Sequence, residues 1–328
     1  MKQMKLGTIG SGVIVRSILD GVKVTEGISL EAVYSRTEEK GRELAEAYGA
    51  EKVYTDLEAF LSDDELNFIY VASPNNLHYE QVKEAFLHGK NVICEKPLCP
   101  RREQVEELAA LAEEKGLLLV DATPTAFLPN LDIIKEWLLK VGRVRLVTAS
   151  YCQYSSRYDK LLEGEVPNVF SPEFAGGCLQ DINYYNIYLN VTLFGKPESA
   201  VYYPNLCRTG VDTSGIAVLR YPDFVSECTG AKDTWGDNMV QIQGEKGYLC
   251  IDGGANGLTN VRLVTKEGEV SRNLQENPDR WLYEVQNMTK MLLEEDHETI
   301  RERLKITAAV IEVMENMRKD AGILFPGE

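Results

Sequence analysis

The sequence predicts a two-domain α/β protein, in which a doubly wound parallel sheet precedes a domain with a large, open and mostly antiparallel sheet. Its 328 residues are enough for two domains with sizeable cores, at roughly 150 residues per domain. Short apolar runs alternate with helical stretches up to about residue 122, and the pattern changes after it. We therefore expect a first domain over residues 1–122 and a second over 123–328.

The first domain reads as strands that alternate with helices. The expected strands lie at 5–10, 28–35, 67–73, 91–95 and 117–122, and the expected helices at 13–22, 37–49, 78–89 and 101–116. This alternation is typical of βαβ units, which build a parallel sheet covered on both faces. Gly49, Gly89 and Gly116 each follow an amphipathic run, where a left-handed helix cap is expected.

The second domain reads mainly as antiparallel strands. A helix over 131–142 is followed by alternating or β-branched runs at 143–154, 198–207, 214–232, 239–254 and 260–270. Turns rich in Gly, Pro and Asp separate these runs, which favours antiparallel neighbours. Two helical stretches, 279–295 and 299–322, follow the last run.

Composition and charge exclude several classes of protein. With 44% hydrophobic and 26% charged residues, the chain has the composition of an ordinary globular protein. No apolar run approaches the roughly 20 residues that span a bilayer, so we expect a cytoplasmic protein without a membrane partner. The net charge of −16 repels phosphate backbones and argues against nucleic-acid binding. The seven cysteines include no Cys-x-x-Cys pair, and we expect reduced core thiols and no metal site.

The segment GSGVIV, residues 10–15, follows the first expected strand and opens the first helix. Glycines at such a junction let the backbone approach a pyrophosphate at a helix N-terminus, which predicts a Rossmann-type site at Gly10, Gly12, Val13 and Ile14. The third glycine position of the fingerprint holds Val15, so the motif is imperfect and an ordinary tight turn is the alternative.

Ser35 and Arg36 end the second expected strand, where an NAD enzyme carries an acidic residue for the adenosine ribose. An arginine can form paired hydrogen bonds to a phosphate, and a serine can donate to the same group. The pair favours NADP over NAD. Glu38 and Glu39 weaken this preference, and Arg36 as a solvated loop residue is the alternative.

Six segments in order resemble the Gfo/Idh/MocA family, the glucose-fructose oxidoreductase and inositol dehydrogenase group. They are GSGVIV, YTDLEAFL (54–61), SPNNLHYEQV (73–82), EKPL (95–98), AGGCLQDINYYN (175–186) and VMENMRKDAGILFP (313–326). The resemblance implies an NAD(P)-dependent oxidoreductase that acts on a small-molecule alcohol or carbonyl substrate, namely a sugar, a polyol or a dihydrodiol-like compound. It also implies a homodimer or homotetramer formed through the second-domain sheet, and a C-terminal helix that packs back on the Rossmann domain.

The resemblance also implies which residues form the site. Glu95 and Lys96 would lie beside the nicotinamide and its ribose, and Ser73 and Asn75 would contact the cofactor. The family's usual catalytic histidine falls on Tyr185, as in a subgroup of sugar and dihydrodiol dehydrogenases that use tyrosine. Asp181 would orient the catalytic pair or bind a substrate hydroxyl. The spacing of four places Asp181 and Tyr185 on one face of an α-helix.

Elementary electrostatics supports a Lys96–Tyr185 pair. Hydride transfer from a carbinol needs a group that takes the hydroxyl proton, and a free tyrosine with a pKa near 10 is a poor base at neutral pH. A lysine ammonium about 4 Å away contributes on the order of 4 kcal/mol at an effective dielectric near 20, which is roughly three pKa units before desolvation. Tyr185 would then work near neutral pH.

Several alternatives remain open on the sequence. Ala126 occupies a position where family members often carry an arginine, so close analogy in substrate choice does not follow. His78 either contributes to the site or only caps or packs. A non-catalytic nucleotide sensor on the same fold would need the cofactor residues but not Lys96, Asp181 and Tyr185. Another Rossmann enzyme, such as a methyltransferase, would explain GSGVIV but not EKPL.

Overall fold

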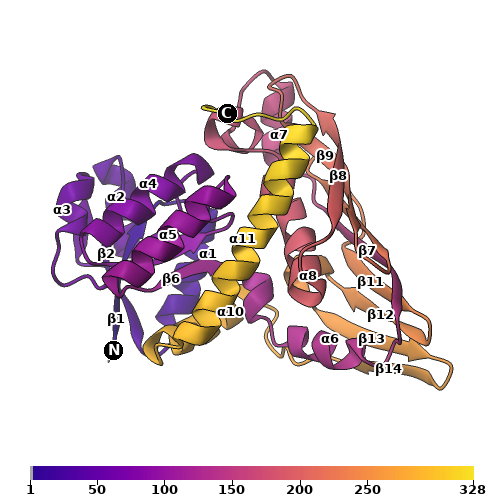
Figure 1. Ribbon diagram of the computed structural model, residues 1–328. Coiled ribbons are helices and arrows are strands. Elements are labelled where there is room, and N and C mark those ends of the chain that lie inside the picture. Colours follow the sequence, from indigo (N-terminus) through magenta and orange to yellow (C-terminus); the bar gives the residue numbers. More distant parts are fainter. Residues whose placement is uncertain (1–2) are drawn as a thin grey trace. The chain divides into compact units, whose positions relative to one another are not determined.

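A computed structural model describes residues 3–328 of the chain (Figure 1). The chain forms two compact units, each of which is built from two separate stretches of sequence. The first unit runs up to Phe127 and includes Asp279–Thr307, and the second comprises Leu128–Pro278 and Ala308–Glu328. A functional boundary at residue 122 stays a prediction.

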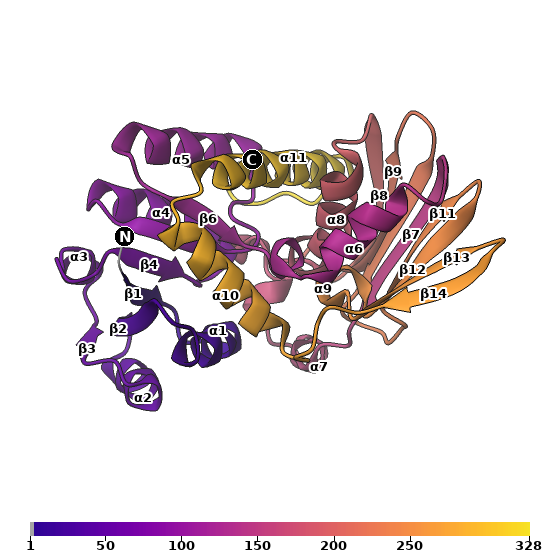
Figure 2. The same ribbon diagram turned by 90° about the horizontal axis from the view of Figure 1, so that it is seen from below.

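The first unit contains a six-stranded sheet with the order β3-β2-β1-β4-β5-β6, in which all neighbours run parallel. The strands are β1 (Met4–Ile9), β2 (Ile28–Tyr34), β3 (Lys52–Tyr54), β4 (Phe68–Val71), β5 (Asn91–Glu95) and β6 (Leu119–Ala122). The helices between them are α1 (Val13–Lys23), α2 (Glu38–Tyr48), α3 (Leu57–Leu61), α4 (His78–Leu87) and α5 (Arg102–Lys115). Figure 2 shows α4 and α5 on one face of the sheet and α1 and α2 on the other. The predicted doubly wound parallel sheet is confirmed.

The sequence pattern explains why these strands are central. Every residue of β4 and β5 is buried, because each strand is an almost continuous apolar run covered on both faces. Gly49, Gly89 and Gly116 take φ angles of +76°, +70° and +65°, which only glycine adopts without strain. The helix stops predicted from these glycines are confirmed.

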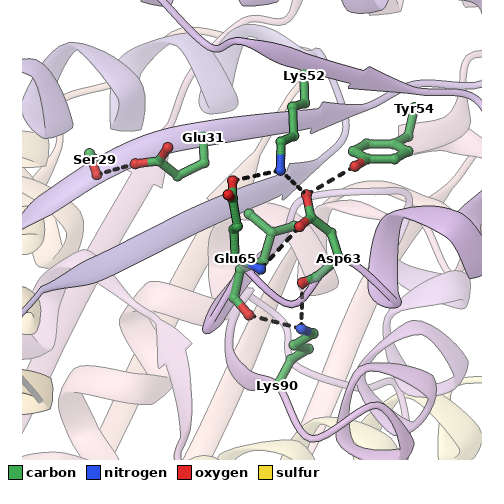
Figure 3. Close-up of polar contacts among 8 residues, drawn as sticks. Ser29, Glu31, Lys52, Tyr54, Asp63, Glu65 and Lys90 are labelled. Atoms are coloured by element: carbon green, nitrogen blue, oxygen red, sulfur yellow. Dashed lines mark hydrogen bonds and ion pairs between the residues drawn. The ribbon is translucent and has the colours of Figure 1, made fainter.

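A polar network ties the edge strand β3 to the loop before β4 (Figure 3). The Lys52 ammonium lies 2.9 Å from the Asp63 carboxylate and 2.7 Å from that of Glu65. The Tyr54 hydroxyl donates to Asp63 at 2.9 Å, and the Lys90 ammonium donates to the Asp63 carbonyl oxygen at 2.7 Å. These contacts hold the start of β4, and Ser73 lies two residues beyond the other end of this strand.

The later stretch of the first unit consists of α10 (Arg280–Leu293) and the beginning of α11 (His297–Asp320). Helix α10 packs against α1 and against the short helix η2 (Pro124–Phe127). The Arg303 guanidinium donates to the Ala126 carbonyl oxygen at 2.9 Å, and the Thr307 hydroxyl donates to the buried Asp121 carboxylate at 2.8 Å. This stretch therefore completes the core of the first unit around the end of β6.

The second unit contains an eight-stranded sheet with the order β14-β13-β12-β11-β7-β10-β9-β8. Its strands are β7 (Val144–Cys152), β8 (Ser199–Leu206), β9 (Asp212–Arg220), β10 (Val225–Ala231), β11 (Met239–Gly244), β12 (Gly247–Asp252), β13 (Asn260–Thr265) and β14 (Gly268–Arg272). All neighbours are antiparallel except β7 and β10, which run parallel. The predicted, mostly antiparallel second sheet is confirmed.

One face of this sheet is buried and the other is largely open. Val147, Ala149 and Tyr151 on β7 are buried, whereas the alternate residues Leu146 and Ser150 are not. Helices cover the buried face, as Figure 1 shows for α8. The helices of this unit besides α11 are α6 (Asn130–Leu138), α7 (Ser156–Leu162), α8 (Tyr184–Phe194) and α9 (Gly254–Gly257), with short helices η3 (Asn168–Phe170), η4 (Pro172–Phe174) and η5 (Leu179–Asn183).

Candidate active site

The predicted cofactor residues lie just beyond the carboxyl ends of neighbouring strands in the first unit. Gly10 follows β1, Ser73 follows β4 after one residue, Lys96 follows β5 and Ser35 follows β2. Between β1 and β4 the strand order reverses direction along the sheet. Ligands of open parallel sheets bind at this edge, next to such a switch point.

The loop between β1 and α1 keeps its backbone close to the neighbouring strand end and leaves open space beside Gly12. Gly10 has a φ angle of +114°, and a Cβ atom there would meet the Ala72 carbonyl oxygen at 2.6 Å. Gly12 is the N-cap residue of α1, and no side chain caps this helix start. A Cβ atom placed on Gly12 would have no neighbouring heavy atom within 4 Å. Val13 at the helix start is 77% exposed, and Ile14 is half-buried. The start of α1 therefore has no side-chain cap and has room beside Gly12, two features that a pyrophosphate at a helix N-terminus requires.

The end of β2 combines a buried serine with an exposed arginine. Ser35 is buried, and its hydroxyl accepts a hydrogen bond from the Thr37 amide at 3.4 Å. Arg36 is exposed at the same strand end. The two side chains are of the types that bind an additional phosphate on the adenosine ribose.

His78 joins the loops that follow β4 and β5. The ring is buried, with Nε2 at 2.9 Å from the Ser73 carbonyl oxygen and Nδ1 at 3.0 Å from that of Pro97. Burial lowers its pKa below the ordinary value. Of the two roles that the sequence left open, the structure gives His78 the packing role. Ser73 is held by its own contact, a hydrogen bond from its hydroxyl to Gln81 at 2.6 Å, and Asn75 opens the short helix η1 (Asn75–Leu77).

Glu95 is buried although it ends a strand next to Lys96. The Tyr70 hydroxyl donates to its Oε1 at 2.7 Å, and the Lys96 amide donates to its Oε2 at 3.2 Å. Burial raises the pKa of Glu95, while the bond from Tyr70 and the charge of Lys96 act in the opposite direction. The Glu95 carboxylate thus braces the backbone from which the half-buried Lys96 projects.

Sequence reasoning missed Glu284 on α10, a further buried acid of this unit besides Glu95 and Asp121. Its side chain is fully buried, and neither carboxyl oxygen has a hydrogen-bond partner among residues 3–328. Burial, followed by the charge of Glu95, raises its pKa well above the ordinary value. Glu284 occupies a position on the apolar, core-facing side of α10, next to Val285. A charged residue at such a position in the sequence was the signal that could have revealed a buried acid.

The second unit places Asp181 in a π-helical turn, η5, directly before α8. The regular α-helix expected at this position is replaced by a π-turn, whose i→i+5 bonds still leave residues four apart near one face; that Asp181 and Tyr185 act together stays a prediction. π-Turns inside helices often accompany functional sites. Asp181 forms an ion pair with the ammonium of Lys232, the residue directly after β10.

Tyr185 occupies the first turn of α8 and is buried. Its ring lies against Tyr151 of β7, with centroids 5.8 Å apart, and against Tyr184 at 5.9 Å. The helix start is fixed to the sheet by amide side chains, because Asn183 donates to the Cys228 carbonyl oxygen and Asn186 to that of Thr229, both at 3.0 Å. The structure thus brings Tyr185 and Asp181 onto consecutive turns of the second unit, and Glu95 and Lys96 onto one strand end of the first.

Metal-binding clusters and membrane-spanning helices are both absent from the described part of the chain. Residues 3–328 contain no group of three or more His, Cys, Asp or Glu side chains arranged to hold a metal ion. Over the same residues, no helix combines the length and the apolar character needed to cross a membrane.

Family models match most of the chain. Residues 4–122 match the oxidoreductase family with an NAD-binding Rossmann fold, and residues 139–250 match the GFO/IDH/MocA C-terminal domain. The chain is 34% identical over 326 residues to the scyllo-inositol 2-dehydrogenase (NADP(+)) IolU of Bacillus subtilis, covering 99% of each protein. It is 25% identical over 345 residues to a trans-1,2-dihydrobenzene-1,2-diol dehydrogenase of Mus musculus, covering 98% of each.

Solved structures show the same fold. Levoglucosan dehydrogenase, in complex with NADH and levoglucosan, superposes with a TM-score of 0.85 at 16% identity, covering 98% of this chain and 97% of that one. KijD10, a 3-ketoreductase from Actinomadura kijaniata in complex with NADP and TDP-benzene, gives a TM-score of 0.84 at 22% identity, with 97% of each chain covered.

The fold and the strand-end residues define an oxidoreductase that uses a nicotinamide dinucleotide, NAD or NADP. More specifically, the chain belongs to the Gfo/Idh/MocA family. The predictions of family, fold class, enzyme class and cofactor class are confirmed.

Proposed function

We propose that this protein transfers a hydride between NADP(H) and a cyclic polyol or sugar that carries neighbouring hydroxyl groups. The observation that carries the proposal is the 34% identity, over 99% of each chain, to an NADP(+)-dependent scyllo-inositol 2-dehydrogenase. Dihydrodiol dehydrogenases are further relatives, and their named substrates also carry neighbouring hydroxyls on a ring.

The cofactor residues are proposed from the geometry of the first unit. Glycines and amides at the start of α1 would hold the pyrophosphate, and Ser35 and Arg36 the ribose phosphate. Residues after β4 and β5 would contact the nicotinamide half. The full proposed set is Gly10, Gly12, Val13, Ile14, Ser35, Arg36, Ser73, Asn75, Glu95 and Lys96. When bound, the dinucleotide supplies the nicotinamide that accepts or releases the hydride.

Lys96, Tyr185 and Asp181 are proposed to move and direct the proton. In the oxidation direction the Tyr185 hydroxyl would take the substrate hydroxyl proton, and the positive charge of Lys96 would stabilise the phenolate. Asp181, whose side chain is 31% exposed, would accept a hydrogen bond from a substrate hydroxyl. Glu95 would hold the Lys96 backbone in place through the bond to its amide.

Location and assembly are proposed on two further observations. All seven cysteines are free thiols, which suits the reducing cytoplasm. The open face of the second sheet carries exposed apolar side chains, and a homodimer or homotetramer would cover them. These residues are Leu146, Val201, Tyr203, Ile216 and Met239.

The experiment that tests the function follows nicotinamide absorbance with NADP and NAD against inositols, aldoses, anhydrosugars and cyclic diols. We expect turnover with NADP and at least one cyclic polyol or sugar. Tight cofactor binding by calorimetry without turnover of any substrate would contradict the proposal and favour a nucleotide sensor.

A further inference from the structure

Lys232 and Asp181 form an ion pair in which the lysine is buried and the aspartate is partly exposed. The Lys232 side chain is only 7% exposed, whereas that of Asp181 keeps 31%. The two residues lie 51 positions apart in the sequence, on the segment after β10 and in the π-turn η5. The ammonium therefore lies inside the protein, and the carboxylate is the member of the pair that a ligand can reach.

The backbone of Lys232 is fixed on both sides. Its amide donates to the Thr213 carbonyl oxygen at 2.8 Å, and its carbonyl oxygen accepts from the Ser155 amide at 2.9 Å. Thr213 belongs to β9, and Ser155 lies in the segment after β7. The ammonium is thus presented by a rigid strand end, which is the kind of support that holds a reactive group in a defined position.

The surroundings of Lys232 are acidic. Asp212 is buried and accepts hydrogen bonds from the Leu179 amide at 2.7 Å and the Tyr202 hydroxyl at 2.5 Å. Asp233 accepts from the hydroxyls of Thr213 at 2.7 Å and Ser214 at 3.0 Å. The titratable groups of this cluster, from every element that builds it, are Cys152, Cys178, Asp181, Tyr202, Asp212, Lys232 and Asp233.

We infer that Lys232 is a positioning residue, which keeps Asp181 ionised and aimed at the substrate. The inference rests on the proposed function, in which Asp181 binds a substrate hydroxyl. Three carboxylates share this region, so removing the ammonium would take away a positive charge that offsets the repulsion between Asp181 and its acidic neighbours. A carboxylate that loses its partner rotates more freely and binds a proton more readily, and both changes weaken a hydrogen bond to a hydroxyl group.

The first test measures Asp181 without any substrate. The carboxyl resonances of ¹³C-labelled aspartates are titrated in the wild type, Lys232→Met and Lys232→Arg, and Asp181→Asn assigns the signal. We expect the Asp181 pKa to rise by about one unit or more in Lys232→Met and to stay near the wild-type value in Lys232→Arg. An Asp181 pKa that is the same in all three proteins would overturn the inference.

The second test measures kinetics on an accepted substrate. Lys232→Met should lower kcat/KM by about 10- to 100-fold, as expected when a binding group is misplaced, and shift the acid limb of its pH profile upward. If Lys232 acts through Asp181, adding Lys232→Met to Asp181→Asn should cost little more than Asp181→Asn alone. Lys196→Met is the matched control, since Lys196 pairs with Glu312 at the surface of the same unit.

The outcomes separate the two proposals. A merely structural Lys232 would lower the melting temperature of Lys232→Met but leave the kcat/KM of the folded enzyme and its acid limb unchanged, which would overturn the inference. If Lys232→Met does not fold, Lys232→Gln and Lys232→Arg give the same comparison. An inactive wild type would overturn the proposed function and the catalytic part of this inference, while the aspartate titration still decides the charge pairing.

Discussion

Lys96 and Tyr185 are the side chains on which the proposed proton transfer depends most. In the proposed mechanism, Lys96→Ala would return the phenol toward its free pKa and Tyr185→Phe would remove the proton carrier, so each should lower kcat by about a hundredfold or more. The double variant should be little worse than the worse single one, because both disable the same step. Steady-state kinetics tests this, with melting curves and cofactor titration to show intact folding and binding.

Tyr184→Phe provides the control for Tyr185→Phe, since both remove a hydroxyl from buried neighbours in the first turn of α8. Near-full activity in Tyr185→Phe would show that Tyr185 is a packing residue.

Arg36 decides between the two dinucleotides in our proposal. Losing a charge-assisted contact of about 1.5–3 kcal/mol should weaken NADP binding by roughly tenfold or more in Arg36→Ala and leave NAD binding nearly unchanged. Calorimetric titration of both cofactors measures this, and the NADP affinity should also fall more steeply with salt. Arg42→Ala on α2 is the matched control, because Arg42 pairs only with Glu38 at the surface among the ion pairs of the described chain. Equal losses for both cofactors would exclude a phosphate-specific role.

At the scale of elements, the π-turn η5 depends on a close approach between Gly177 and Asp212. Gly177 has a φ angle of +122°, and a Cβ atom there would lie 2.3 Å from Asp212 Oδ1. Gly177→Ala should therefore combine backbone strain of about 1–3 kcal/mol with a steric clash. Gly164→Ala is the matched control, because Gly164 has a φ angle of +102° and open space around its Cβ position. Urea unfolding of both variants should show a larger loss for Gly177→Ala, and equal losses would mean that the clash is relieved.

Asp212 of β9, which accepts a hydrogen bond from Leu179 in this π-turn, should make the free energy of unfolding depend on pH. Burial raises the pKa of Asp212 from 3.8 to about 6, although bonds from Tyr202 and Leu179 and the charge of Lys232 oppose the shift. Between these values the native state holds a proton that the unfolded state has lost, so the contribution of Asp212 to stability falls as pH rises. The loss amounts to about 3 kcal/mol and is complete above pH 6.

Asp212→Asn removes this titration. The free energy of unfolding of the variant relative to the wild type should therefore increase between about pH 4 and pH 7. Urea unfolding at several pH values measures the difference, and a difference that is constant with pH would contradict the assignment.

The elements also show what the sequence can and cannot predict. Strand runs such as 91–95 and the stops at Gly49, Gly89 and Gly116 were predictable, because apolar periodicity and positive-φ glycines act locally. The π-turn was not, since α- and π-turns have no distinct sequence pattern. The Lys232–Asp181 pair was also missed, because pairing of strands far apart in the sequence brings these two residues together.

At the scale of the whole molecule, the open sheet face predicts self-association. The exposed fractions of Val201, Tyr203 and Ile216 are 48%, 65% and 42%, and register places these residues on one face of β8 and β9. We expect a dimer or tetramer by light scattering at micromolar concentration. Tyr203→Glu with Ile216→Glu should shift it toward monomer, whereas Leu139→Glu, which changes an exposed residue next to α6, should not. A wild-type monomer would contradict the prediction.

The first unit combines two stretches of sequence that lie far apart in the chain, and this arrangement affects its folding during synthesis on the ribosome. Asp121 at the end of β6 receives a hydrogen bond from Thr307, a residue 186 positions later. A ribosome extends the chain from its N-terminus, at about 5–20 residues per second. The nascent first unit must therefore wait roughly ten seconds or longer for Asp279–Thr307, with the surface that α10 will cover exposed in the meantime. During synthesis, the cofactor-binding half of this enzyme is among the last parts to be completed, although its sequence begins the chain.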